Sequence, residues 1–84
     1  MAALDGAVAS GEGAEIARAA HAFKSPAGAI GARALEGMLL SMELAGQAGS
    51  IDQARISLDR VRPEVELVLQ QLRLERERTD HDHS

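Results

Sequence analysis

The sequence predicts an all-α protein, a small antiparallel four-helix bundle with a short N-terminal helix. Three observations favour this class. Among 84 residues there are one aromatic residue, four Val and four Ile, whereas the good helix formers Ala, Leu, Arg and Glu are frequent. Apolar residues recur at spacings of three and four along three segments. Glycine-containing stretches separate these segments, as the short turns of such a bundle require.

The first predicted helix covers Ala2–Ser10 and is short. Its apolar residues are Leu4 and Val8. Gly6 lowers its helical propensity, and the glycines that follow Ser10 end it.

The second predicted helix begins at Ala14 and ends before Gly31. Its apolar face consists of Ile16, Ala19, Ala20, Phe23, Ala27 and Ile30. These spacings of three, four and one are those of one buried helical face. Pro26 lies inside the helix, where it removes the N–H that would donate to the Ala22 carbonyl. We therefore expect a kink near Pro26.

The third predicted helix covers residues 32–45. Its buried face consists of Leu35, Leu39, Met42 and Ala45, and Arg33, Glu36 and Glu43 lie away from it. Because glycine favours chain reversals, Gly46 and Gly49 are expected to form the turn that follows.

The fourth predicted helix begins at Ile51, because Ser50 and Gln53 have the spacing of a capping box. Its buried seam has alternating steps of three and four: Ile51, Ala54, Leu58, Val61, Val65, Val68 and Leu72. Packing should end near Leu72, with a charged extension to Arg78, and Pro63 predicts a second kink. Three residues off the seam are candidates for an edge that a partner covers: Ile56, Leu67 and Leu74.

The length of the chain supports one domain, which we place at residues 1–78. Residues 79–84 are polar and lack an apolar anchor, so we expect a disordered tail. His81 and His83, with Asp80 and Asp82, could bind a metal ion weakly, but a flexible tail offers no fixed geometry. We therefore expect no metal site.

The net charge of −4 argues against a general affinity for nucleic acid or anionic lipid, which depends on clustered Lys and Arg. The longest apolar cluster, residues 38–40, is too short to cross a bilayer, and no secretory signal is recognisable. These features predict a cytoplasmic protein. The chain contains no cysteine, which excludes disulfides.

His21 is the candidate chemical centre. At 100° per residue, Ala14, Ala17, Lys24, Ser25 and Gly28 lie within about 60° of His21, on the side of the helix away from its apolar face. We therefore expect His21 to face solvent on a low surface. Lys24, the only lysine, follows at i+3 on the same face. A neutral imidazole is nucleophilic, and a nearby ammonium offsets phosphoryl charge, so this pattern predicts a minimal phosphoacceptor site.

A longer motif surrounds this pair. It consists of Ala20-His21-Ala22-Phe23-Lys24-Ser25, then Gly28, Ile30-Gly31-Ala32 and Leu35. The motif resembles the A-H-x-L-K-G/S and I/L-G-A-x-x-L patterns of the histidine-containing phosphotransfer (HPt) domain of bacterial phosphorelays. Glu43 and the turn at Gly49 also fall where that family has an acidic residue and a glycine. The resemblance covers about residues 4–72.

The resemblance implies that His21 accepts a phosphoryl group, that Lys24 stabilises its charge, and that Gly28, near Ser25, keeps the docking face open. The group would pass from a receiver-domain phospho-aspartate to His21, with Nε2 as the preferred nitrogen, and then to the aspartate of a second receiver. Response-regulator receiver domains are the implied partners, and a hybrid histidine kinase is a further candidate. No cofactor is expected on this chain, because the receiver supplies Mg²⁺.

The protein would then be a phosphoryl carrier without kinase activity of its own, since it has no Gly-rich phosphate loop. The alternative is a noncatalytic helical interaction or dimerisation module, with His21 and Lys24 as ordinary solvated residues, and a homodimer stays open. A hydrolase is disfavoured, because no carboxylate is recognisable that would orient the imidazole beside Ser25.

Overall fold

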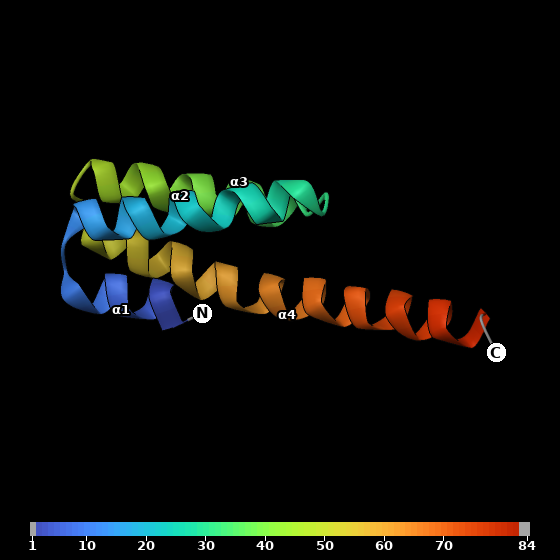
Figure 1. Ribbon diagram of the computed structural model, residues 1–84. Helices are drawn as coiled ribbons and strands as arrows, with labels where there is room; N and C mark the ends of the chain where they lie inside the picture. The colour runs from blue at the N-terminus through green and yellow to red at the C-terminus, as the bar shows by residue number, and fades with distance from the viewer. Residues whose placement is uncertain (1, 83–84) are drawn as a thin grey trace.

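The structure, a computed structural model, describes the backbone of residues 2–82 and the side chains of residues 2–77. The four helices in this range are α1 (Ala2–Ser10), α2 (Gly13–Ala29), α3 (Arg33–Gln47) and α4 (Ile51–Asp82). The predicted all-α class is confirmed, and each predicted helix is present. Helices α2 and α3 lie side by side, α4 runs along them, and α1 packs against α2 and α4 (Figure 1).

The same backbone motif ends α2 and α3. Gly31 and Gly49 have positive φ values of 75° and 73°, which glycine adopts without steric cost. The N–H groups of the residues that follow, Ala32 and Ser50, donate at 2.9 Å to carbonyls five residues back. This pattern is the Schellman motif, which satisfies the last carbonyls of a helix. Helices α2 and α3 therefore end at Ala29 and Gln47, each within two residues of its predicted end.

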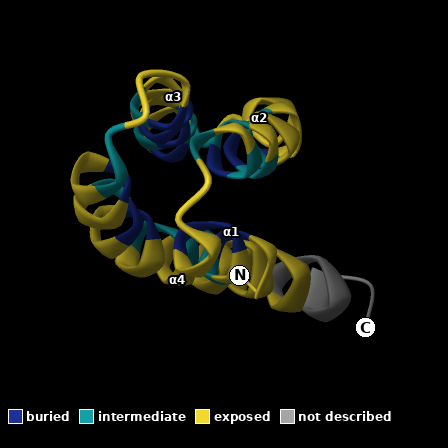
Figure 2. Cartoon of the chain, turned by 90° about the vertical axis from the view of Figure 1, so that its left-hand side faces the viewer, coloured by how far each residue is buried: buried dark blue, intermediate teal, exposed yellow. Residues whose placement is uncertain are grey.

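The core is formed by apolar side chains from all four helices. Figure 2 shows the buried residues on the sides of the helices that face one another. The largest that are fully buried are Leu4, Ile16, Leu39, Met42 and Val61. The predicted faces are thus confirmed in their central parts. Ile30 and Leu72, which were predicted to be packed, are instead 51% and 40% exposed. The physical reason is the length of α1, whose nine residues span about 13 Å, half the length of α2.

Helix α4 continues past the turn between α2 and α3 (Figure 1). Its 32 residues span about 48 Å. The backbone is helical through Asp82, which includes four residues of the segment 79–84 that was predicted to be disordered. The side chains of that segment lie outside the described residues, so the division at residue 78 stays a prediction.

Helix α4 begins at Ile51 as predicted, but among the described residues no side-chain hydrogen bond joins Ser50 and Gln53, so the capping box is not formed. Both α2 and α4 continue through their prolines, Pro26 and Pro63, and the kinks stay predictions. No helix in the described part of the chain is long and apolar enough to cross a membrane.

Gly46 was predicted to belong to a turn, but it is buried within α3 at a close contact with α2. A Cβ at this position would lie 2.7 Å from the Ala17 nitrogen and 2.7 Å from the Gly13 carbonyl oxygen. Both are backbone atoms, which cannot move without separating the helices. The absence of a side chain at Gly46 therefore sets the distance between α2 and α3.

Alanine at Gly46 is expected to destabilise the protein by about 1–3 kcal/mol, because its methyl group overlaps the backbone of α2. The matched control is Gly37→Ala in the same helix, where a Cβ meets nothing within 4 Å. There the higher helical propensity of alanine should stabilise by about 0.5–1 kcal/mol. Urea unfolding followed by circular dichroism measures both. Equal effects of the two substitutions would contradict the close contact.

Candidate functional site

His21 projects from the middle of α2, on the face opposite the core. Its side chain is 68% exposed, as the helical wheel predicts. Ala14, Ser25 and Gly28, on the same side of α2, are also exposed and small. A bulky partner can therefore approach the ring without displacing large side chains.

Glu43 of α3 contacts both His21 and Lys24. Its Oε2 lies 2.9 Å from His21 Nδ1, and its Oε1 accepts a hydrogen bond of 2.8 Å from Lys24 Nζ. The Glu43 side chain is only 12% exposed, although the sequence placed it away from the packed face of its helix. That expectation was wrong, because this flank of α3 faces α2 rather than solvent.

The pKa of Glu43 is lowered from its ordinary value. The hydrogen bond from Lys24 is the largest cause. Burial has the next largest effect and raises the pKa, whereas the charge of Lys24 and the contact with His21 lower it. Glu43 is therefore ionised at neutral pH, and an ionised carboxylate can only accept hydrogen bonds. Nδ1 must then be the donor in the His21–Glu43 contact, and the neutral ring carries its lone pair on Nε2.

Lys24 lies beside His21 as predicted, but it is not a free cation. Its side chain is 28% exposed and forms an ion pair with Glu43. With neutral His21, the charges of Lys24 and Glu43 cancel. The site therefore presents an ammonium whose charge is already partly compensated, together with an exposed imidazole nitrogen.

The comparison with protein families gives a match to the Hpt domain over residues 1–76. The match covers most of the chain. This chain belongs to the Hpt domain family. Membership implies histidine phosphotransfer in a phosphorelay, and Hpt domains interact with receiver domains and histidine kinases. Neither the comparison with curated proteins nor that with solved structures gives a match.

Ser25 and Gly28 of this Hpt domain are both exposed on the His21 side of α2. Gly28 is covered from one side by α3, because a Cβ there would overlap the Glu36 carboxylate. Since that carboxylate ends a flexible side chain, a small substitution at Gly28 would be tolerated. That Gly28 keeps the docking face open stays a prediction.

The carboxylate that sequence reasoning found missing for a hydrolase triad is present, since Glu43 orients the imidazole of this Hpt domain. The stated ground for disfavouring a hydrolase was therefore wrong. A triad also needs a serine hydroxyl bonded to the other ring nitrogen. Both residues are among those that the structure describes, and Ser25 Oγ makes no hydrogen bond to His21 there.

No group of three metal-ligating side chains occurs among the described residues. The side chains considered for a weak metal site, from Asp80 to His83, lie outside the described ones.

The sequence contains an incomplete signal for the place of Glu43 in this site. It lies seven residues after Glu36, so both project from the same face of α3. Two acidic residues in one register indicate a flank of α3 with which a basic residue of a neighbouring helix can pair. A wheel drawn for a single helix cannot show this, because it does not say where the neighbouring helix lies.

Glu43→Gln should change how stability depends on pH. Because the folded-state pKa of Glu43 is lowered, its ionised form stabilises the fold above the ordinary glutamate pKa of about 4.3. That contribution is lost as pH falls below this value and through the lowered folded-state pKa. Between pH 7 and pH 3, the wild type should therefore lose more unfolding free energy than Glu43→Gln. Thermal unfolding followed by circular dichroism measures both losses.

The control for this experiment is Glu66→Gln, at an exposed position of α4. If the control removes as much of the pH dependence as Glu43→Gln does, the contact among Glu43, Lys24 and His21 is not its source.

Proposed function

We propose that this Hpt domain relays a phosphoryl group between receiver-domain aspartates through Nε2 of His21. The observation that supports this assignment is the Glu43 contact, which engages Nδ1 and leaves the lone pair of the neutral ring on the exposed nitrogen. An exposed nucleophile held in one orientation is what transfer between two separate proteins requires.

The transfer forms a P–N bond at Nε2 and breaks the P–O bond of the donor's phospho-aspartate, whose carboxylate leaves. Because Nδ1 keeps its proton, the ring becomes positively charged as the new bond forms. The Glu43 carboxylate, 2.9 Å from Nδ1, stabilises that charge. Transfer to the second receiver reverses these changes. Glu43 is therefore a positioning residue, since it acts on the phosphoryl group only through His21.

Lys24 has two roles in this proposal. Its ammonium lies one helical turn from His21, near the oxygens of a phosphoryl group on the ring. It also keeps Glu43 ionised through the hydrogen bond of 2.8 Å.

Mg²⁺ comes from the receiver domain, and this chain supplies no kinase activity. In this proposal the fold is an antiparallel four-helix bundle, and the protein acts in the cytoplasm. A hybrid histidine kinase is a further partner.

Incubation with a phosphorylated receiver domain is expected to label the wild type with a phosphate that is stable in base and labile in acid. His21→Gln should abolish the label, because the side chain has no nucleophilic nitrogen. Retained helical circular dichroism would show that the variant is folded. Labelling of His21→Gln at the wild-type level would exclude His21 as the acceptor.

Lys24→Ala is expected to slow labelling by about 10- to 100-fold, less than the loss of a preorganised donor costs in an enzyme, because Lys24 is partly exposed and already paired with Glu43. Lys24→Arg should recover part of the rate, because it retains a cation. Single-turnover transfer from a phosphorylated receiver measures these rates. Since Lys24 lies off the core, a large loss of helical signal in Lys24→Ala would assign it a structural role instead.

A further inference from the structure

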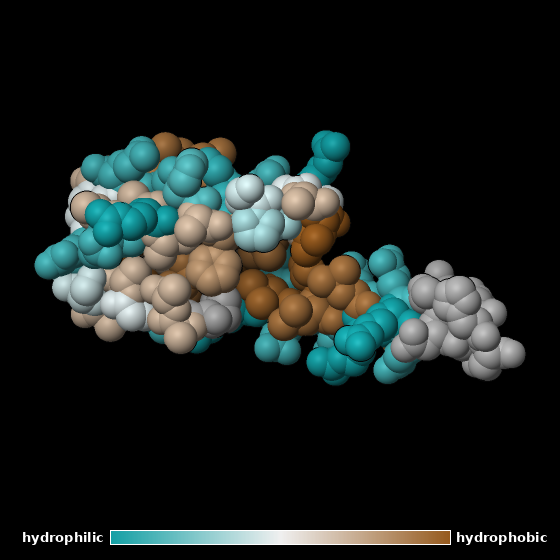
Figure 3. Space-filling view, viewed as in Figure 1, coloured by the Kyte–Doolittle hydropathy of each residue, from teal (hydrophilic) through white to brown (hydrophobic). Residues whose placement is uncertain are grey.

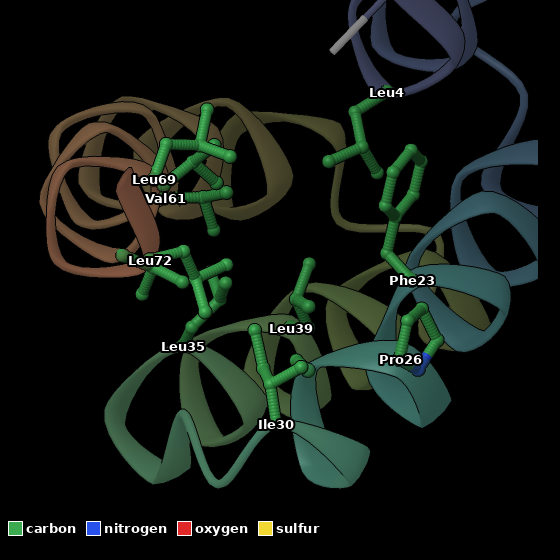
Figure 4. A pocket seen from close by; sticks show the side chains of 12 residues that line it. Leu4, Phe23, Pro26, Ile30, Leu35, Leu39, Val61, Leu69 and Leu72 are labelled. Atoms are coloured by element: carbon green, nitrogen blue, oxygen red, sulfur yellow. The ribbon is translucent and has the colours of Figure 1, made fainter. Parts of the chain in front are cut away.

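Two different surfaces lie on opposite sides of α2. One is an apolar cleft of about 220 Å³, whose lining includes Phe23 and Ile30 of α2 and Leu72 of α4 (Figure 4). Figure 3 shows the brown area onto which it opens, between the main body and the projecting end of α4. Phe23 and Ile30 lie about 160–180° around α2 from His21. The cleft therefore faces away from any protein that binds around His21.

The other surface is the His21 face, which consists of the exposed side of α2 around His21 and the adjoining flank of α3. Glu36 of α3 contributes a carboxylate to it. This carboxylate lies against Gly28 and occupies the space that a Cβ at position 28 would take. Gly28 lies about 20° around α2 from His21 and about 10 Å further along the helix. The absence of a side chain at Gly28 thus lets Glu36 reach the face that carries His21.

The Glu36 carboxylate has no partner, whereas the Lys and the Arg of α2 are both paired. Lys24 binds Glu43, and Arg18 Nη1 lies 3.1 Å from Glu15 Oε1. Among the described residues, no hydrogen bond or ion pair involves Glu36, although its side chain is partly buried. Glu36 is therefore a charge that this face leaves for another protein to pair.

A receiver domain that exchanges a phosphoryl group with His21 must cover Glu36. Each partner in a stable interface of standard size buries about 800 Å², which corresponds to a patch roughly 30 Å across. A patch centred on His21 extends beyond Gly28, which lies about 10 Å away along α2. Removal of an unpaired carboxylate from water is unfavourable unless the other protein supplies a positive charge.

We propose that Glu36 selects receiver domains by their charge, and this inference rests on the phosphotransfer function proposed above. The receiver domain that Glu36 favours places a lysine or arginine side chain against it. A receiver domain with an aspartate or glutamate at that place is repelled, because unfavourable charge contacts exclude wrong partners. Glu36 does not contact the reacting atoms. It therefore determines which receiver binds and leaves the transfer step itself unchanged.

Single-turnover transfer at increasing concentrations of a phosphorylated receiver domain separates binding from transfer. Glu36→Gln should raise the receiver concentration that gives half the maximal rate by about 3- to 10-fold, because it removes one partly buried charge contact. The maximal rate should stay the same. The matched control is Glu66→Gln, which removes the same charge from an exposed position of α4 and should change neither quantity.

Equal effects of the two substitutions would overturn the proposal. So would a lower maximal rate of Glu36→Gln with an unchanged half-maximal concentration, since Glu36 would then act on the transfer step. Retained helical circular dichroism shows that each variant is folded. A wild type that no phosphorylated receiver domain labels would contradict the phosphotransfer function itself, and the selection with it.

Charge reversal identifies the partner of Glu36 on the receiver domain. Glu36→Lys should weaken binding of the receiver that the wild type accepts by about 10-fold or more, because it brings like charges together. The exposed Lys and Arg residues of that receiver are then replaced by Glu, one at a time. One such variant should bind poorly to the wild type and well to Glu36→Lys. If no receiver variant does so, selection does not depend on a charge pair at Glu36.

Gly28→Ala tests the contact that positions Glu36, since its methyl group would displace the carboxylate. It should weaken receiver binding in the wild type and have little further effect in Glu36→Gln, because both substitutions act through the same contact. Additive effects of the two substitutions would contradict this contact and would show that position 28 influences docking independently of Glu36.

Discussion

A single carboxylate between α2 and α3 organises the candidate site of this Hpt domain. Glu43 is largely removed from solvent, and removal of a charge from water is unfavourable unless partners replace the lost hydration. Lys24 and His21 are those partners. Both come from α2, so the ionised carboxylate contacts these two side chains and at the same time joins the two helices.

This arrangement depends on how closely the helices approach. Gly46 lies three residues after Glu43, and its lack of a side chain allows the backbone of α3 to contact α2 near Ala17. His21 lies four residues after Ala17. The close backbone contact and the carboxylate contact are therefore about one helical turn apart, and the first sets the spacing that lets Glu43 reach the imidazole. Packing and site chemistry are thus linked through one small residue.

Much of this architecture could be predicted from local patterns. The glycines at 31 and 49 mark the turns, apolar spacing identifies the central core, and the wheel correctly turns His21 toward solvent. The environment of Glu43 could not be predicted in this way, because it depends on which flank of α3 meets α2. The exposure of Ile30 and Leu72 escaped prediction for a related reason: periodicity identifies an apolar face but does not show whether a neighbour covers it.

The contact between Glu43 and Nδ1 also bears on the regiochemistry of the proposed reaction. An imidazole that rotates freely about its Cβ–Cγ bond exposes either nitrogen and can yield two phosphohistidine isomers. Here the nitrogen nearer the backbone is occupied by a carboxylate, which also repels an approaching anion. Only the isomer substituted at the distal nitrogen is then accessible. A single product isomer would give every incoming receiver the same phosphorus position and the same direction of attack.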